Sequence, residues 1–341
     1  MTHANKQQTL NIGRSITQVC AIVLCLIIAG CMNTDHTRSI DDPSSLQSTR
    51  NLYHFARICM GSRCTIVIEA DSEIDAARAA TAAFEEITRI EQVLSDYRSD
   101  SEAMQLVRKA PNQWHSVSDT LFEVLVRSMD IHKETHGAFD PTVGAFTSLW
   151  RESSMPDKDS IKNAAGRVGM DHIQLDPVSR SVRLGSSGMI LDFGGIGKGY
   201  AAQRAIELIR SMGYRVACVD MGGDLVVGDP PTNQPDGWRV EIADGLGDSR
   251  IEYRSNCAIA TSGDLERFYV YEGVRYSHII DPKTGYGIRE RRAVTVIASD
   301  AARADALASA VSVVGEQVVD ALELANPHIE IQLVTRSMNS E

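Results

Sequence analysis

The residues best suited to chemistry form a glycine-rich stretch near the middle of the chain. Glycines at positions 194, 195, 197 and 199 surround Lys198, directly after the apolar run that contains Asp192. Glycines allow a sharp turn and a close approach to a ligand, and backbone N–H groups at the start of a helix attract an anion. Because Lys198 adds a mobile positive charge, the stretch indicates a cradle for a phosphate or a pyrophosphate.

This stretch does not follow the common phosphate-binding motifs. A Walker loop needs Gly where Asp192 stands and Ser or Thr where Gly199 follows the lysine, and the glycine spacing is not that of a dinucleotide fingerprint. Asp192, Phe193 and Gly194 match the Asp-Phe-Gly motif of protein kinases, but no His-Arg-Asp loop precedes them. A tight strand-to-helix turn without a ligand is therefore the alternative for this stretch taken alone.

A second candidate group is the pair Asp305 and Ser309. The two residues are four apart in a predicted helix, which places a carboxylate and a hydroxyl on one helix face. Both are hard oxygen ligands of the kind that Mg²⁺ accepts, with phosphate oxygens and water completing the shell. The alternative is a solvated Asp and a Ser that is hydrogen-bonded back to its own helix.

His278 is the third candidate, since a histidine can act as a general base near neutral pH. It follows a strand-like run and precedes a turn at Asp281-Pro282. A structural hydrogen bond is the competing interpretation for this side chain. No GxSxG or HExxH motif is present, so hydrolases of those kinds have no support.

The elements that must position these groups follow from apolar periodicity and turn residues. Ser72 and Ser118 are predicted to cap two helices, the first with an apolar stripe from Ile74 to Leu94 and the second ending at Gly137. Further helices are predicted at 162–169, 200–212, 301–314 and 317–325. Strands are predicted at 63–70, 189–193, 216–221, 225–227, 238–243, 251–253, 258–260, 268–271, 293–298 and 329–334. This order favours an α+β fold with largely antiparallel sheets flanked by helices, over a doubly wound parallel sheet.

Composition limits the possible partners. The chain has 341 residues and a formal net charge of −11, which argues against a nucleic-acid-binding surface. An acidic protein that binds an anion needs a local positive device such as a metal, a lysine or a helix terminus. Four cysteines lie beyond the first 31 residues without CxxC spacing, so free thiols are favoured over a zinc site, with one disulfide as the alternative.

The N-terminal segment indicates export. Lys6 and Arg14 precede an apolar run at 19–29 that is too short to span a bilayer. The run ends in the residues IAGC at 28–31, which resemble a bacterial lipobox, with Cys31 as the lipidated first residue of the mature protein. We expect a lipoprotein signal at 1–30, a flexible polar tether at 31–52 and one domain at 53–337. The expected location is the bacterial cell envelope, on a membrane and facing the periplasm; a plain secretory signal or an uncleaved anchor is the alternative.

Eight motifs in the domain resemble, in order, those of the FAD:protein FMN transferase (ApbE) family. They are MGS at 60–62, LSDY at 94–97 with SE at 101–102, THGAFDPTVG at 135–144, LDFGGIGKGY at 191–200, DMGGD at 220–224, TSGD at 261–264, HIIDP at 278–282 and ADALASA at 304–310. The resemblance implies a T-fold-like α+β fold. It also implies a Mg²⁺-dependent enzyme that takes FAD as substrate, transfers FMN to a threonine hydroxyl of a target protein and releases AMP.

The resemblance also assigns residues and partners. The FAD site would be lined by Met60, Tyr97, Ala138, Phe139, Asp140, Asp192, Lys198 and His278. The metal would be held by the Gly195 carbonyl, Asp305 and Ser309, and His278 would take the proton from the attacking threonine. The targets would be subunits of membrane redox complexes, with the enzyme itself on the membrane through its lipid.

Three positions depart from the family pattern, and two further functions stay open. The family usually has Thr where this chain has Ser62 and Ser309, and often Asp where it has Gln203. The alternatives are an FAD pyrophosphatase that uses water and gives FMN and AMP, and a flavin-binding lipoprotein without catalysis. The presence together of Asp305, Ser309 and His278 argues against the second of these.

Overall fold

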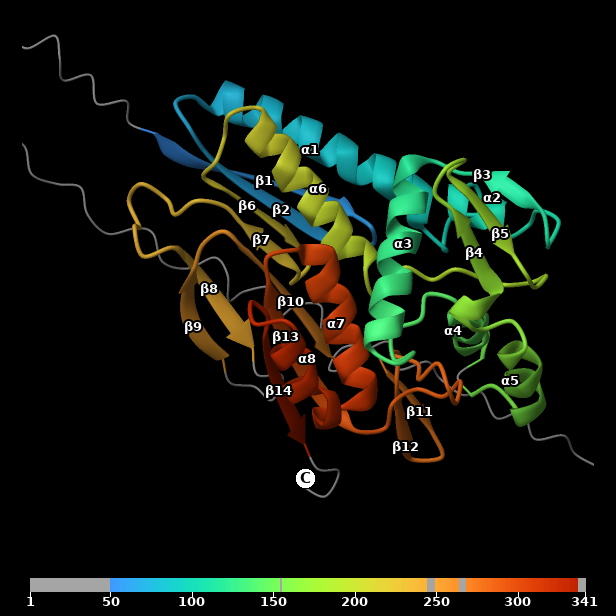
Figure 1. The fold of residues 1–341 in the computed structure, drawn as a ribbon. Coiled ribbons are helices and arrows are strands. Elements are labelled where there is room, and N and C mark those ends of the chain that lie inside the picture. Colours follow the sequence, from blue (N-terminus) through green and yellow to red (C-terminus); the bar gives the residue numbers. More distant parts are fainter. Residues whose placement is uncertain (1–49, 154, 244–248, 264–267, 337–341) are drawn as a thin grey trace, which may run out of the picture. The chain divides into compact units, whose positions relative to one another are not determined.

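A seven-stranded sheet, antiparallel at every pairing, forms the centre of the fold (Figure 1). The computed structural model describes residues 50–153, 155–243, 249–263 and 268–336. The strands lie in the order β1-β2-β6-β7-β10-β13-β14. Their bounds are β1 Asn51–Cys59, β2 Ser62–Ala70, β6 Ala217–Met221, β7 Leu225–Val227, β10 Cys257–Gly263, β13 Arg291–Ala298 and β14 Glu330–Arg336.

The other elements surround this sheet. Small sheets are formed by β3-β5-β4, β8-β9 and β11-β12. Their strands are β3 Trp114–Ser116, β4 Ile173–Asp176, β5 Ser181–Leu184, β8 Trp238–Ala243, β9 Ser249–Arg254, β11 Phe268–Tyr271 and β12 Val274–Ser277. The helices are α1 Glu73–Leu94, α2 Glu102–Leu106, α3 Asp119–Glu134, α4 Gly144–Glu152, α5 Lys158–Ala165, α6 Gly197–Ser211, α7 Ala301–Val314 and α8 Val319–Ala325, with 3₁₀ turns at Met170–His172 and Glu316–Val318.

Helices cover one face of the main sheet, and the β8-β9 ribbon packs against the other. Successive strand side chains point to opposite faces. In β2, Ile66 and Ile68 therefore join the core shared with α1, α6 and α7, while Val67 packs with Val240 and Ile242 of β8. Figure 1 shows α1 and α6 side by side over the sheet, with α7 next to α6. The expected α+β class, with antiparallel sheets flanked by helices, is confirmed.

α1 forms where its cap and its apolar period predict. The Ser72 hydroxyl accepts a hydrogen bond from the Asp75 N–H at 3.2 Å, which satisfies one free donor of the first turn. The buried face includes Ala76, Ala80 and Ile87. Ile74 was expected on this face but is 75% exposed, because two residues correspond to about 200° of rotation, which carries Ile74 away from Ala76.

α6 and α7 approach each other closely at a glycine. A Cβ atom at Gly199 would lie 2.1 Å from the Ala301 carbonyl oxygen and 2.8 Å from the Asp305 Cβ. No side chain fits in that space, so glycine is required there. This contact brings the start of α6, with its lysine, against the first turns of α7.

α4 was not predicted from the sequence. It packs against the β11-β12 hairpin and the segment that follows this hairpin. Its Trp150 indole N–H donates to the Gly285 carbonyl at 2.9 Å, and its ring lies 5.3 Å from the rings of both Tyr269 and Tyr276. Ile280 packs in the same cluster. α4 thus fixes both the β11-β12 hairpin and the segment that follows it.

Several predicted bounds differ from the structure. The predicted strand at 189–193 forms only an isolated parallel bridge between Ile190 and Val143, since no described strand pairs along it. Met189, Leu191 and Phe193 are nevertheless buried. α6 begins at Gly197 rather than at 200, and the weak helix predicted at 162–169 is α5 at Lys158–Ala165. β1 begins at Asn51, inside the range predicted as a tether.

The export segment is not covered by the structure. Cys31, the predicted signal and most of the predicted tether lie outside the described residues, as does Asp264 of the TSGD motif. None of the helices in the described ranges is long and apolar enough to cross a membrane. Cys59, Cys64, Cys218 and Cys257 are free thiols.

Candidate active site

The glycine turn before α6 packs directly onto the predicted metal residues. A Cβ atom at Gly195 would lie 2.7 Å from the Ser309 hydroxyl oxygen and 3.5 Å from the Phe139 ring. The absence of a side chain at Gly195 therefore lets the turn lie against α7. Gly195, Ser309 and Phe139 come from three distant motifs and lie together here.

Asp305 lies inside this contact. Its carboxylate is 5% exposed and accepts a hydrogen bond from the Gly199 N–H at 3.0 Å. Burial raises the pKa of Asp305 to about 7, and repulsion from Asp224 adds to the rise, while Lys198 and the Gly199 N–H oppose it. A buried carboxylate of this kind is stabilised in its charged form by a cation.

The donor set fits Mg²⁺. The carboxylate of Asp305, the hydroxyl of Ser309 and the carbonyl of Gly195 are all hard oxygens. Within the described ranges, no three or more His, Cys, Asp and Glu side chains are grouped to hold a metal. The set therefore offers one carboxylate, which suits an ion that keeps several waters and shares its shell with substrate phosphates.

Lys198 forms an ion pair inside the site. Its ammonium pairs with the carboxylate of Asp224, which directly precedes β7 and is 3% exposed. Asp224 belongs to the DMGGD motif, whose Asp220 accepts from the Gly223 N–H at 2.8 Å and so shapes the turn. The lysine of the cradle is thus held in place by a buried acid before any phosphate arrives.

Asp192 forms the second part of the site, on the other side of the glycine turn. One of its oxygens accepts from the Gly194 N–H at 2.8 Å. The other accepts from the Thr147 hydroxyl at 2.8 Å and from Arg151 at 3.1 Å. Arg151 also donates to Asp96 at 2.6 Å. Burial raises the pKa of Asp96 to about 6, with repulsion from Asp192 in the same direction and Arg151 opposing.

Tyr97 and Met60 lie at the edges of this arrangement. The Tyr97 side chain is 75% exposed, and the Arg151 guanidinium carbon stands 4.2 Å from the centre of its ring. Met60 has a positive φ of 49° in the β1-β2 turn, and its N–H donates to Glu91 at 3.1 Å. Its terminal methyl lies 3.5 Å from where a Cβ of Gly197 would be.

Asp140 is turned into the protein. It is buried together with Ala138 and Phe139. One of its oxygens accepts from both the N–H and the hydroxyl of Thr142, at 2.8 and 2.6 Å, and the other lies 3.5 Å from His132. Burial raises the pKa of Asp140, while these hydrogen bonds lower it. In this structure Asp140 supports the turn that carries Phe139.

His278 is exposed and follows the last residue of β12. The segment around it is anchored by the buried Ser277, whose hydroxyl accepts from the Ile279 N–H at 3.0 Å. α4 links this segment to Asp192, because Trp150 contacts one and Thr147 the other. The contacts of segment 192–199 bring together Gly195, Lys198, Asp305, Ser309 and Phe139, whereas His278 lies on a separate segment that α4 holds.

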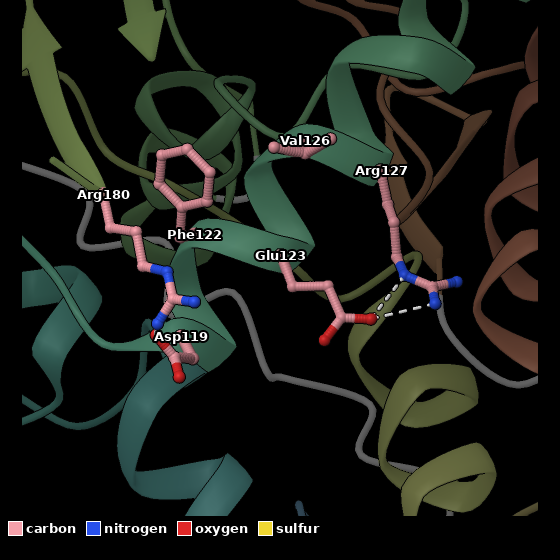
Figure 2. A pocket seen from close by; sticks show the side chains of 6 residues that line it. All are labelled: Asp119, Phe122, Glu123, Val126, Arg127 and Arg180. Carbon is pink, nitrogen blue, oxygen red and sulfur yellow. Dashed lines mark hydrogen bonds and ion pairs between the residues drawn. The ribbon is translucent and has the colours of Figure 1, made fainter. Parts of the chain in front are cut away.

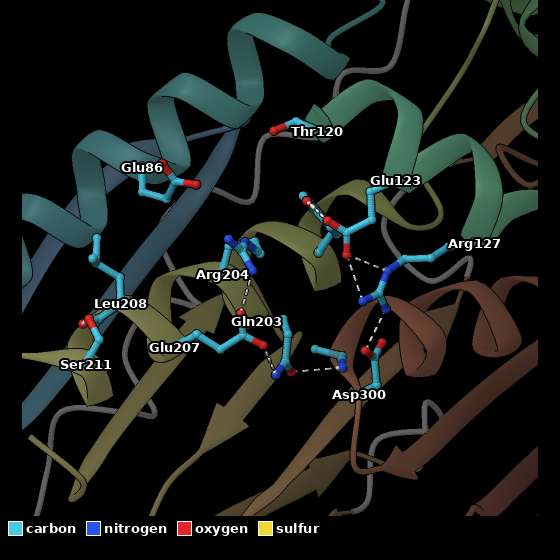
Figure 3. Close-up of polar contacts among 12 residues, drawn as sticks. Glu86, Thr120, Glu123, Arg127, Gln203, Arg204, Glu207, Leu208, Ser211 and Asp300 are labelled. Carbon is cyan, nitrogen blue, oxygen red and sulfur yellow. Dashed lines mark hydrogen bonds and ion pairs between the residues drawn. The ribbon is translucent and has the colours of Figure 1, made fainter. Parts of the chain in front are cut away.

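Gln203, one of the departures from the family pattern, joins helices. Its amide oxygen accepts from the Ala301 N–H at 3.2 Å, and its nitrogen donates to Glu207 at 2.9 Å (Figure 3). Figure 3 places it among the contacts between α3, α6 and α7, where Arg127 pairs with Asp300 at 2.6 Å. The glutamine therefore links α6 to the start of α7.

A cavity of about 550 Å³ along α3 shares no residue with the predicted site (Figure 2). Its charged groups are engaged with one another or with nearby helices: Arg180 pairs with Asp119, and Glu123 pairs with Arg127 at 2.9 Å. Glu123 also accepts from the Tyr200 hydroxyl at 2.9 Å. The Tyr200 hydrogen bond joins α6 to α3, and the Arg180 pair joins α3 to the β4-β5 turn. The lining residues are Asp119, Phe122, Glu123, Val126, Arg127 and Arg180.

Sequence reasoning missed three polar residues of the site. Thr147 and Arg151 come from α4, and Asp224 was quoted within a motif but given no contact. A signal for α4 was present, since Ala145, Phe146, Leu149 and Trp150 recur at helical spacing. For Asp224 only the fold could show that it meets Lys198.

The site combines the glycine-framed start of α6, a lysine paired with the buried Asp224 and the buried Asp305 of α7, in a fold whose antiparallel sheet is flanked by helices. The chain belongs to the ApbE family, whose model matches residues 60–333. An FAD:protein FMN transferase of Treponema pallidum is 31% identical over 302 residues, covering 82% of this chain and 83% of the relative. Another, of Klebsiella pneumoniae, is 28% identical over 308 residues, covering 86% and 85%.

Solved structures show the same fold. The ApbE protein from Thermotoga maritima is 32% identical, with a TM-score of 0.76 over 84% of this chain and 94% of that one. The flavin transferase ApbE from Vibrio cholerae is 25% identical, with a TM-score of 0.77 over 85% and 95%.

Proposed function

We propose that this chain is an FAD:protein FMN transferase that uses Mg²⁺, attaches FMN to a threonine hydroxyl of a target protein and releases AMP. The observation that carries the proposal is the contact of the glycine turn with α7, which places Gly195 against Ser309 and the Gly199 N–H on Asp305. The family and the names of the relatives support the activity.

The reaction needs a positioned diphosphate and neutralised charge more than covalent chemistry. The threonine oxygen forms a bond to the FMN phosphorus, the bond from that phosphorus to the AMP oxygen breaks, and AMP leaves with the electron pair. Gly195, Asp305 and Ser309 would hold Mg²⁺, which when bound would polarise the phosphate oxygens. Lys198, released in part from Asp224, would neutralise the charge that develops on the leaving phosphate.

His278 would accept the threonine proton. A threonine hydroxyl is a weak nucleophile until a base removes its proton. The imidazole is exposed at the end of β12, where a protein acceptor can reach it. Met60, Tyr97 and Asp192 would contact the flavin end of FAD, while Ala138 and Phe139 would line the site and Asp140 would support the turn that carries them.

The acceptor and the location belong to the same proposal. The targets would be threonine-bearing subunits of membrane redox complexes. The enzyme would be tethered by lipid at Cys31 to a membrane of the bacterial envelope and would face the periplasm. The IAGC sequence at 28–31 and the apolar run before it support this.

The test is to incubate the purified protein with FAD, Mg²⁺ and candidate acceptors and to measure AMP and the mass of the acceptor. An acceptor that gains the mass of FMN less water, with one AMP released for each, is expected. Asp305→Asn is the matched variant, because the amide oxygen can still accept from Gly199 while the charge is lost. AMP and free FMN without a modified acceptor would indicate a pyrophosphatase, and FAD binding without AMP would indicate a flavin-binding protein.

A further inference from the structure

Arg151 lies between two of the predicted site motifs and has no role in the proposed reaction so far. It lies in the last turn of α4 and donates to Asp96 at 2.6 Å and to Asp192 at 3.1 Å. The same guanidinium stands 4.2 Å from the centre of the Tyr97 ring. One side chain thus joins the LSDY motif to the start of the glycine turn.

The two ion pairs hold the guanidinium firmly. The side chains of Asp96 and Asp192 are largely buried, and that of Arg151 is about two-thirds buried. A planar fork of N–H donors can serve two carboxylates and stack on an aromatic ring at the same time, which an ammonium cannot do. Thr147, one turn earlier on α4, donates to the same oxygen of Asp192 and adds to the fixed geometry.

The Tyr97 ring has the Arg151 guanidinium over it but stays largely exposed. Its side chain is 75% exposed although Arg151 covers one part of it, so most of the ring is available to another planar group. Asp192, for its part, has both oxygens engaged, one with Gly194 and the other with α4. Arg151 therefore supports an exposed aromatic surface and the carboxylate of Asp192, which precedes the glycine turn, together.

We propose that Arg151 is a positioning residue for the flavin end of FAD, which holds the Tyr97 ring and the Asp192 carboxylate where the flavin meets them. The inference rests on the proposed function, since it needs FAD as the ligand. Arg151 does not itself reach the reacting phosphates in this assignment. Its loss should therefore weaken flavin binding and leave the phosphate centre at Asp305 and Lys198 intact.

The experiment compares the full-length protein with Arg151→Lys and Arg151→Met. Lysine keeps the charge but loses the fork and the stacking surface, and methionine keeps the apolar stem. Arg98→Met is the matched control, because Arg98 is next to Tyr97 in the chain but pairs with the exposed Asp100. Each protein is titrated with FAD, FMN and ADP, and the melting temperature is measured.

Both Arg151 variants should bind FAD and FMN more weakly, on the order of tenfold, as expected for a lost charge-assisted hydrogen bond and a lost cation–π contact. ADP, which lacks the flavin, should bind as before, and KM for FAD should rise while kcat at saturating FAD is retained. The quenching of flavin fluorescence on binding should decrease in the variants. Arg98→Met should match the parent in every titration.

The results separate this inference from the proposed function. Parent protein that binds FAD, with Arg151→Lys binding FAD and FMN equally well, would overturn the inference and leave the function standing. Equal losses for FMN and ADP in the more conservative Arg151→Lys would also overturn it, because that pattern marks a general structural effect. Parent protein that binds neither FAD nor FMN would remove the function and the inference together.

Discussion

Lys198 and Asp224 form an ion pair between the first turn of α6 and the residue that precedes β7. The Asp224 side chain is 5% exposed, whereas the lysine side chain is 31% exposed. The acid is therefore the partner whose burial would be the more costly if the pair were broken. A phosphate bound at the glycine turn would have to share Lys198 with Asp224, so the pair sets how much positive charge the cradle can offer.

This asymmetry predicts the outcome of a double substitution. Lys198→Met should destabilise the protein by about 1–3 kcal/mol, below the value for a fully buried pair because solvent reaches the lysine. Adding Asp224→Asn should restore most of that stability, since no buried charge is left without a partner, but should not restore AMP release. Urea unfolding of the two single variants and the double variant measures the coupling. Additive losses would contradict an energetic pair.

A second prediction concerns the α6–α7 contact. Gly199→Ala places a methyl group 2.1 Å from the Ala301 carbonyl oxygen and 2.8 Å from the Asp305 Cβ. The helices must move apart, which should cost about 1–3 kcal/mol of stability and displace Asp305 from its hydrogen bond, so AMP release should fall as well. Unfolding midpoints and AMP assays measure both effects.

The control for that substitution is Gly166→Ala. Gly166 ends α5 with a φ of −68°, and a Cβ atom there meets nothing within 4 Å. Alanine should be tolerated at Gly166 with unchanged activity. If Gly199→Ala behaves like Gly166→Ala, the close contact between the helices does not constrain the site.

The sequence predicted those parts of the site that depend on local spacing. Asp305 and Ser309 share a helix face because the helical period fixes it, and the Ser72 cap marks the start of α1 for the same kind of reason. The apolar run at 189–193 misled us, because burial of Met189 and Leu191 follows from hydrophobicity while strand pairing needs a neighbour that the sequence does not show.

The parts that could not be predicted are long-range pairings. Lys198 meets Asp224 only because β6 and β7 fold back beside α6, and Arg151 meets Asp96 only because the last turn of α4 lies beside the segment that follows α1. Both pairs join residues far apart in the chain, and the periodicity of apolar residues in the sequence does not predict such contacts. Gln203 shows the same limit, since its bond to Ala301 depends on how two helices pack.

The third prediction concerns the anchoring of the protein to a membrane. Cys31 follows small residues at the end of the apolar run, and lipid attached there would tether the domain without a spanning helix. Cys31→Ser should release the protein from membranes into the soluble envelope fraction and remove the mass of the lipid. Membrane association of the variant equal to that of the parent would contradict anchoring through Cys31.

The last prediction concerns His278 and separates a transferase from a flavin-binding protein. His278→Asn keeps a similar size and some hydrogen bonding but removes a base that works near neutral pH. General-base help is typically worth on the order of a hundredfold to ten-thousandfold in rate. Single-turnover transfer to a threonine-bearing acceptor should fall by a factor in that range, while the FAD dissociation constant should change little because His278 is exposed beyond β12.

The control is His328→Asn, since His328 is also exposed but lies in the turn before β14. It should leave both FAD binding and transfer unchanged. If His278→Asn instead lost FAD affinity while keeping its rate at saturating FAD, His278 would be a flavin contact and another group would take the proton. If neither FAD affinity nor the transfer rate changed, His278 would have a structural role only. The base would then have to be one of the side chains that α4 and the glycine turn bring together.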